Sequence, residues 1–185
     1  LGSRGLGDVY KRQGVISVGK QNAQPFVKRL QEYAPIENIS RLNTQSTDKE
    51  IKGIVDVISH STQTIIAIFS DKKEEIQLAE KILKKATGKV LVFFTSPYSI
   101  PKYEELTAEA EAIIVAYENN PVMQECAAEV LFGGTSADGK LPVSTGKYPQ
   151  GSGIFIPECR LGHAFPEEVD MDSRILSRID SIVQE

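Results

Sequence analysis

The chain has 185 residues, of which 41% are hydrophobic and 25% are charged, as expected for one globular domain with a sizeable core. A net charge of −4 without a basic cluster gives no electrostatic reason to expect nucleic-acid binding. No run of residues approaches the ~18 apolar residues of a membrane span. The two histidines and two cysteines lack paired ligand spacing, so we expect neither a metal nor a cofactor.

The first 13 residues do not resemble the rest of the chain. Residues 8–13, DVYKRQ, back-translate to GATGTGTATAAGAGACAG, which resembles the transposon end of a common sequencing-library adapter. We therefore expect residues 1–13 to be adapter read-through, disordered and outside the fold. A flexible basic tail would give the same structural expectation. Read-through also predicts that a preceding portion of the protein is missing.

From Gly14 onward, apolar runs typical of buried strands alternate with amphipathic segments typical of helices. Strands are expected at residues 15–18, 36–42, 64–69, 90–94 and 112–116. Helices are expected at residues 25–33, 48–60, 74–87, 102–109 and 121–132.

Several helix ends are marked by capping residues. Thr47 and Glu50 have the spacing of a capping box, in which each side chain bonds the other residue's backbone N–H. Asn120 suits an N-cap and Pro121 suits the first helical position, where its missing N–H has no cost. Gly133 suits the left-handed residue that ends a helix.

The alternation of strands and helices implies right-handed crossovers and a parallel sheet covered on both faces. We therefore predict an α/β fold over residues 14–156: a three-layer α/β sandwich with a mostly parallel sheet, flavodoxin-like in outline. Residues 157–171, rich in proline and charge, are predicted to be a linker. Residues 172–185 have helical periodicity, and we expect them to be the first helix of a truncated following domain.

The stretch at 133–144, GGTSADGKLPVS, is one residue short of the nucleotide-binding pattern G-x-x-x-x-G-K-[ST], with Leu141 in place of the hydroxyl residue. A phosphate loop follows a strand and opens a helix. These glycines instead follow a predicted helix, and Pro142 stands where the next helix would begin. We predict that the segment ends a helix, turns at 137–140 and continues as an edge strand at 141–143.

Other isolated patterns have ordinary structural explanations. Residues 70–73 match the S-x-x-K motif of penicillin-recognising serine hydrolases, but neither S-D-N nor K-T-G follows, so solvated loop residues are expected. Cys126 lies on an apolar helical face and is expected to be a buried thiol. Glu118 follows a buried strand at the carboxyl edge of the sheet, where open α/β sheets bind ligands. A solvated loop glutamate remains the alternative for Glu118.

The segment AIIVAYENNPVMQECAAEVLFGGTSADGKLPVS resembles the C-terminal α/β-sandwich domain of glycoside hydrolase family 3. The family's hallmark, a-a-x-x-L-F-G-x-x-x-x-x-G-x-L-P-V-S, corresponds to residues 127–144. VLVFFTSPYSI is similar to the family's preceding strand and its loop. Residues 151–185 are similar to the tether of a bacterial subgroup in which a β-N-acetylglucosaminidase-like protein continues into a β-lactamase-type serine hydrolase domain.

The resemblance implies that the catalytic groups lie elsewhere. In this family the nucleophile is an Asp on an N-terminal TIM-type barrel, and in the N-acetylglucosaminidase branch a His on a barrel loop is the acid/base. Both would precede Gly14, so no catalytic residue is assigned to this chain, which alone should be inactive. In glucosidase branches a Glu of the second domain acts as acid, but the sequence around Glu118 does not match that motif.

The resemblance implies a non-catalytic accessory domain that packs on the missing barrel and lines one side of its sugar site. Its parent would be a periplasmic or secreted glycosidase acting on β-linked sugars such as N-acetylglucosaminides. The expected cleft residues lie in the loops after two neighbouring strands, and they are Tyr98, Tyr117, Glu118 and Asn119.

Two alternatives stay open. A free-standing flavodoxin-like module could bind a small anion or nucleotide through residues 19–23, although the chain lacks G-x-G-x-x-G. A purely structural spacer between two catalytic domains would place no loop against substrate.

Overall fold

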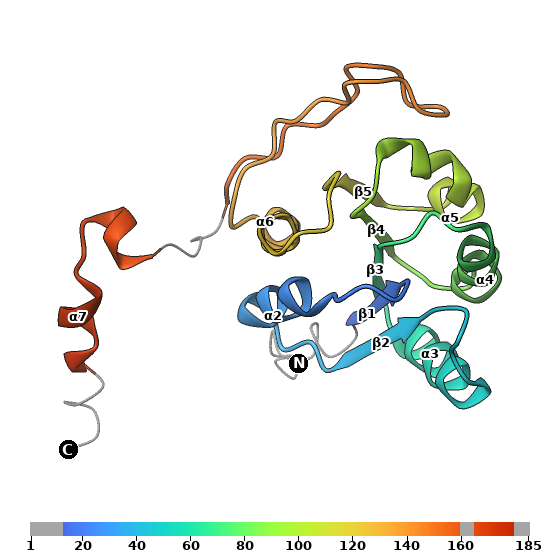
Figure 1. Cartoon of the computed structure of the whole chain (residues 1–185), viewed down its shortest axis with the longest axis horizontal. Helices are drawn as coiled ribbons and strands as arrows, with labels where there is room; N and C mark the ends of the chain where they lie inside the picture. The colour runs from blue at the N-terminus through green and yellow to red at the C-terminus, as the bar shows by residue number, and fades with distance from the viewer. Residues whose placement is uncertain (1–12, 160–164, 180–185) are drawn as a thin grey trace, which may run out of the picture.

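The structure is a computed structural model that describes residues 13–159 and 165–179. At its centre is a five-stranded sheet in which every strand pair is parallel, in the order β2-β1-β3-β4-β5 (Figure 1). The strands are β1 (Gln13–Val18), β2 (Asn38–Leu42), β3 (Gln63–Ile68), β4 (Lys89–Phe93) and β5 (Ala112–Val115). The predicted α/β class and parallel sheet are therefore confirmed. Strand β1 begins one residue before the expected start of the domain.

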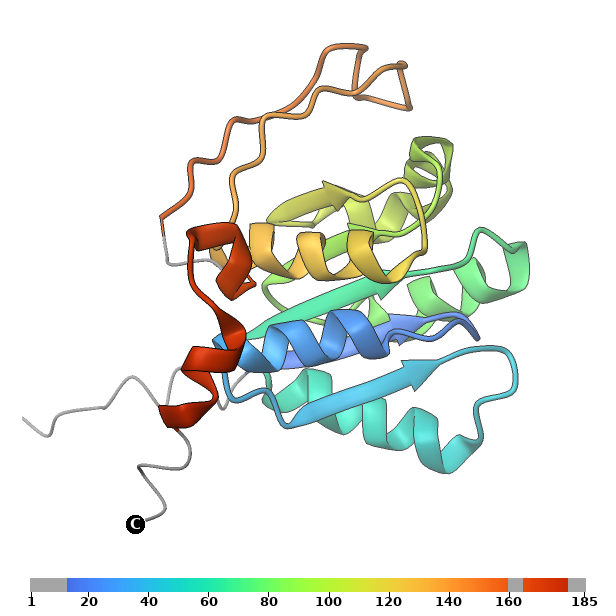
Figure 2. The same cartoon turned by 60° about the vertical axis from the view of Figure 1, so that its left-hand side comes forward.

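Helices cover both faces of the sheet. They are α2 (Gln24–Tyr33), α3 (Asp48–His60), α4 (Lys73–Leu83), the 3-10 helix η1 (Pro97–Tyr103), α5 (Glu104–Ala108) and α6 (Pro121–Phe132). Figures 1 and 2 show α2 and α6 on one face and α3, α4 and α5 on the other. This arrangement is the predicted three-layer sandwich.

The sheet divides the core into two clusters, because successive side chains of a strand point to opposite faces. Ile16, Ile66 and Leu91 lie in register across β1, β3 and β4 and pack with the α3 and α4 side. Ile65 and Ala67 of β3 belong to the cluster on the α2 and α6 side. All five side chains are fully buried, which explains why β3 is apolar at consecutive positions.

Three predicted helix caps are confirmed, whereas α4 ends at Leu83, short of the predicted end at residue 87. Glu50 N donates to Thr47 Oγ1 at 3.4 Å and Thr47 N donates to Glu50 Oε2 at 2.7 Å, which completes the capping box. Asn120 Oδ1 accepts from the N–H of Met123 at 2.9 Å. Gly133 ends α6 with a φ of 74°, a left-handed conformation that glycine adopts at little cost.

Beyond α6 the chain runs out and returns as a long two-legged arm, residues 134–159 (Figure 2). Ala137 and Ile156 form an antiparallel bridge near its base, and Thr145 and Tyr148 form another at its tip. The arm is therefore held by hydrogen bonds between its own legs.

This pairing overturns two expectations for the GGTSADGKLPVS stretch, which forms the outgoing leg. The edge strand predicted at 141–143 and the turn predicted at 137–140 are both wrong. Leu141 N donates to the carbonyl of Ser152, and Gly151 N donates to the carbonyl of Leu141. Leu141 therefore forms its backbone hydrogen bonds with the returning leg of the arm and not with the edge of the sheet.

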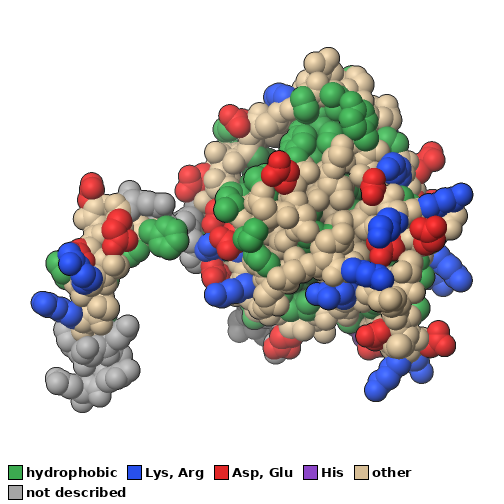
Figure 3. Space-filling model, viewed as in Figure 1, with side chains coloured by type: hydrophobic (Ala, Val, Ile, Leu, Met, Phe, Trp, Pro, Cys, Tyr) green, Lys and Arg blue, Asp and Glu red, His purple; other side chains and the backbone are tan. Residues whose placement is uncertain are grey.

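The returning leg exposes large apolar side chains. Ile154 is 83% exposed and Phe155 is 63% exposed. Figure 3 shows hydrophobic side chains gathered at the top of the molecule, over the arm. An apolar surface of this kind is typical of a region that another protein surface covers.

The C-terminal segment contains η2 (Pro166–Val169) and α7 (Ser173–Leu176), which lie apart from the sandwich in Figure 1. The helix expected at 172–185 is seen only over its first part, and residues 180–185 lie outside the described residues, as do residues 1–12 of the expected adapter segment. Within 13–159 and 165–179, no helix is long and apolar enough to cross a membrane.

Candidate functional site

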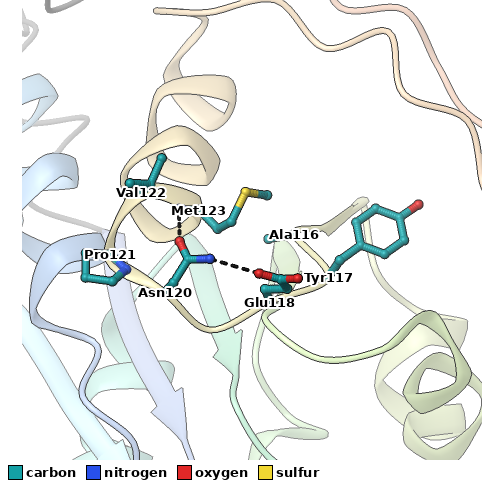
Figure 4. A pocket seen from close by; sticks show the side chains of 7 residues that line it. All are labelled: Ala116, Tyr117, Glu118, Asn120, Pro121, Val122 and Met123. Atoms are coloured by element: carbon teal, nitrogen blue, oxygen red, sulfur yellow. Dashed lines mark hydrogen bonds between the residues drawn. The ribbon is translucent and has the colours of Figure 1, made fainter.

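A pocket of about 560 Å³ lies at the carboxyl edge of the sheet, between the end of β5 and the start of α6 (Figure 4). Its lining side chains come from one continuous segment, and they are Ala116, Tyr117, Glu118, Asn120, Pro121, Val122 and Met123. Two of the four predicted cleft residues, Tyr117 and Glu118, are in this lining. The carboxyl edge is where open α/β sheets bind ligands.

The backbone at Tyr117 is strained. Its φ is 62°, and the N–H of Glu118 donates to the carbonyl of Ala116 at 2.6 Å. A hydrogen bond from residue i+2 to residue i around a central residue of positive φ is the rare form of γ-turn. Such a conformation costs on the order of 1–3 kcal/mol in a non-glycine residue and occurs often at functional sites.

The tight turn separates the two side chains that it carries. Figure 4 shows the Tyr117 ring pointing away from α6 and the Glu118 carboxylate pointing towards Asn120. Glu118 Oε2 accepts from Asn120 Nδ2 at 3.0 Å, while Asn120 Oδ1 caps α6. The helix cap thus fixes the position of the carboxylate. The result is a pocket with apolar walls, one aromatic ring at its rim and one oriented carboxylate.

Asn119 does not line the pocket, and its side chain instead forms a hydrogen bond within the fold. Its Oδ1 accepts from Gln124 Nε2 at 2.6 Å. The same Nε2 also donates to the carbonyl of Asn22, and Gln124 Oε1 accepts from the N–H of Phe26 at 3.1 Å. Gln124 is buried and joins the loop after β5, the loop after β1 and the first turn of α2. No sequence motif predicted this role.

These contacts also occupy the start of α2, which directly follows residues 19–23, where the alternative hypothesis placed an anion. Gln24 N donates to Asn22 Oδ1 at 2.9 Å, and Pro25 has no N–H. The next backbone donor, Phe26 N, donates to Gln124 Oε1, and Gly19 N donates to the carbonyl of Leu42. The backbone N–H groups of Gly19, Gln24 and Phe26 are therefore used within the fold and are not free to bind a phosphate.

Tyr98 lies after the neighbouring strand β4, on η1, and its side chain is 59% exposed. Ser96 shapes the loop: its Oγ accepts from the N–H of Tyr98 at 3.4 Å and its carbonyl accepts from the N–H of Ser99 at 2.9 Å. The carboxyl ends of β4 and β5 are adjacent because these strands pair in the sheet. Tyr98 and Tyr117 are thus presented from neighbouring strand ends.

The S-x-x-K pattern is not a nucleophile site. Ser70 is buried, contrary to the expectation of a solvated residue, and its Oγ accepts from the N–H of Lys72 at 3.2 Å. The carbonyl of Ser70 accepts from the hydroxyl of Tyr103, whose pKa is raised by burial. A hydrogen bond and the charge of Lys102 lower the pKa of Asp71. These groups attach the loop after β3 to η1.

A single carboxylate, that of Glu118, lines the pocket after β5, whereas hydrolysis of a glycosidic bond requires two. A second pocket is lined by Asp71 and Glu80, but Asp71 pairs with Lys102 at 3.0 Å and Glu80 Oε1 accepts from the N–H of Glu105 at 3.0 Å. Among the residues that the structure describes, no group of three or more His, Cys, Asp or Glu side chains could hold a metal.

Cys126, expected to be buried, is exposed on α6. The buried face of that helix is formed by Gln124, Ala127 and Ala128.

Comparison with solved structures gives a likeness in fold. No family model matches the chain, and no curated protein matches it. Among solved structures, the chain is similar to a glycoside hydrolase family 3 β-N-acetylglucosaminidase from Paenibacillus sp. str. FPU-7, with a TM-score of 0.53 and 17% sequence identity. The match covers 66% of this chain and 25% of that one. At this identity the likeness shows the fold, and the chain corresponds to about a quarter of the longer protein.

Proposed function

We propose that this chain is the non-catalytic accessory domain of a family 3 glycosidase that hydrolyses β-linked N-acetylglucosaminides. It packs on a TIM-type barrel and lines one side of the barrel's active site with the loops after β4 and β5. The observation that carries the proposal is the strained γ-turn at Tyr117 beside an oriented Glu118. The L-F-G to L-P-V-S segment and the likeness in fold to a family 3 enzyme support it.

The chemistry of the pocket suits a sugar. An aromatic ring offers an apolar face to the C–H groups of a pyranose ring. A carboxylate and side-chain amides accept and donate the hydrogen bonds that hydroxyl and acetamido groups make. Tyr117 at the rim of the pocket and Tyr98 on the neighbouring loop supply the rings, and Glu118 with Asn120 supplies the polar groups. A few placed polar groups among apolar walls are typical of small-ligand sites.

The arm supplies the second part of the proposal. Its exposed Ile154 and Phe155 form a surface that a neighbouring domain would cover. We place the barrel against this surface. The β-lactamase-type serine hydrolase domain would follow the C-terminal segment, and the whole protein would be periplasmic or secreted.

The proposal is tested by joining a family 3 barrel to this chain ahead of Gly14. Steady-state hydrolysis of p-nitrophenyl N-acetylglucosaminide is compared for the parent, Tyr117→Ala and Glu118→Ala. We expect KM to rise several-fold in both variants, because the side chains contact the sugar. Glu37→Ala, an exposed residue just before β2 at the opposite edge of the sheet, is the matched control. Unchanged KM and kcat in both site variants would favour the spacer.

A further inference from the structure

The tip of the arm is the part of it that returns to the sandwich. Thr145 is only 3% exposed, whereas Ser144 and Gly146 on either side of it are exposed. Its Oγ1 donates to the carbonyl of Pro97 at 2.8 Å, across 48 residues of sequence. Pro97 is the first residue of η1, directly before Tyr98. The arm therefore ends on the loop that carries one of the candidate cleft residues.

The geometry of the tip makes this contact specific. Thr145 and Tyr148 exchange both backbone hydrogen bonds, at 2.8 and 3.0 Å, around the two residues between them. Gly146, the first of the two, has a φ of 53°, as in a two-residue hairpin turn with glycine at its first central position. A Cβ at Gly146 would lie 3.1 Å from Pro101 Cγ, so the turn sits closely against η1.

The Tyr98 loop is thus held from two sides. On the inner side, Tyr103 of η1 is fully buried and its hydroxyl donates to the carbonyl of Ser70 at 2.7 Å. On the outer side, the Thr145 hydroxyl satisfies the Pro97 carbonyl. Without it that carbonyl would lose a buried hydrogen bond to the arm. Tyr98 lies between these two attachments with its side chain largely exposed.

We propose that Thr145 is a positioning residue: through the Pro97 carbonyl, it holds the loop after β4 in the shape that presents Tyr98 to the sugar. This inference rests on the proposed function for the sugar, but the mechanical link between arm tip and loop can be measured without any ligand. Thr145 itself does not contact the sugar, and it acts only through the loop after β4.

The experiment uses the full 185-residue chain, labelled with ¹⁵N, as wild type, Thr145→Val and Thr145→Ser. Amide hydrogen exchange is read at Ser99, whose N–H donates to Ser96 within the loop. We expect Thr145→Val to speed this exchange by about tenfold, because the hydroxyl is lost while the shape is kept. Thr145→Ser keeps the hydroxyl and should stay within about twofold of wild type. Equal exchange at Ser99 in wild type and Thr145→Val would overturn the proposal.

Thr107→Val is the matched control, because it removes another buried threonine hydroxyl, which donates to the carbonyl of Glu104 within α5. Exchange at Ser99 should not change in it; a rise equal to that of Thr145→Val would overturn the proposal. Gly146→Ala is a second way to weaken the contact between the tip of the arm and η1, because the added Cβ strains the turn and crowds Pro101. It should speed exchange at Ser99 as Thr145→Val does, and an unchanged rate would also count against the link.

The same samples are then titrated with N-acetylglucosamine. We expect wild type to show shift changes at Tyr98 and Tyr117, and Thr145→Val to lose those at Tyr98 while keeping those at Tyr117. Equal responses at Tyr98 in both proteins would overturn the positioning role and leave the proposed function standing. No response in wild type, together with faster exchange at Ser99 in Thr145→Val, would count against the proposed function and leave the link between arm and loop intact.

Discussion

The side-chain amide of Gln124 donates to the side-chain oxygen of Asn119 across 2.6 Å. Asn119, which the sequence predicts to line a cleft, therefore forms a hydrogen bond with the buried side chain of Gln124. Because Gln124 also bonds Phe26 N and the carbonyl of Asn22, hydrogen bonds join the loop after β5, the loop after β1 and the start of α2 into one unit. The strained turn at Tyr117 is attached to this unit, which can hold it in a costly conformation.

Gln124→Ala should lower the free energy of unfolding by about 2–3 kcal/mol, because it leaves the buried Phe26 N–H and two acceptors without this partner. The measurement is urea denaturation followed by circular dichroism. Gln77→Ala, at an exposed position on α4, is the control and should change stability by less than about 0.5 kcal/mol. Equal, small effects in both variants would show that the Gln124 network does not support the fold.

Lys89→Met should destabilise the domain by about 1–3 kcal/mol. The Lys89 side chain is 3% exposed, and its Nζ donates to the carbonyls of Lys84 and Ala86 and to Glu109 Oε2, each at 2.8–2.9 Å. Methionine keeps most of the apolar stem but leaves both carbonyls without this donor. Thermal unfolding measures the effect. A variant as stable as wild type would mean that water replaces the ammonium group at no cost.

The same ion pair makes stability depend on pH. The hydrogen bond and charge of Lys89 lower the pKa of Glu109 below its ordinary value of 4.5. A carboxylate with a lowered pKa in the folded state stabilises the fold above about pH 4.5, and this contribution is lost as the pH falls through the folded pKa.

The difference in unfolding free energy between wild type and Glu109→Gln should therefore be largest above pH 5 and shrink towards pH 3. Denaturant titrations at pH 7, 5, 4 and 3 test this expectation. In a Lys89→Met background most of the pH-dependent difference should disappear, because only the weaker effect of the Lys84 charge on the pKa of Glu109 remains. A difference that persists at every pH in that background would show that Lys89 is not its source.

Much of the fold could be predicted because its determinants are local. The capping box at Thr47, the Asn120 cap and the Gly133 stop each depend on residues within a few positions, and all three are found in the structure. The buried strands are equally clear, since a parallel strand covered on both faces needs an uninterrupted apolar run such as Ile65–Ile68.

The errors concern partners that are distant in sequence. Extended residues at 141–143 could pair with the sheet or with another extended segment, and nothing local distinguishes a sheet edge from the returning leg of the arm. The buried face of α6 was misplaced for a related reason. A glutamine is expected to face solvent, yet Gln124 is buried because three groups from other elements bond it. Cys126 consequently faces outward.

For the candidate site, the sequence indicates which loops follow the strands but not the geometry of these loops. Tyr117 and Glu118 could be selected because they follow a buried strand at the carboxyl edge. The positive φ of Tyr117 could not be predicted, since bulky residues rarely adopt it.

Tyr117→Gly should leave the domain at least as stable as wild type. Glycine adopts a positive φ without strain, and the relief of ~1–2 kcal/mol offsets its greater loss of chain entropy on folding. Tyr98→Gly is the control, because Tyr98 does not have a positive φ and should lose stability on replacement. Chemical denaturation compares the two. A loss of more than about 1 kcal/mol in Tyr117→Gly would contradict the view that the turn is strained.

The proposed function requires that the loops after β4 and β5 contact a sugar. Its most direct test is a titration of the ¹⁵N-labelled chain with N-acetylglucosamine and, separately, with flavin mononucleotide. We predict saturable shift changes at Tyr98, Tyr117 and Glu118 with the sugar, and none at residues 19–23 with the nucleotide. Saturable changes at residues 19–23 with flavin mononucleotide, and none at the three loop residues with the sugar, would contradict the proposed function.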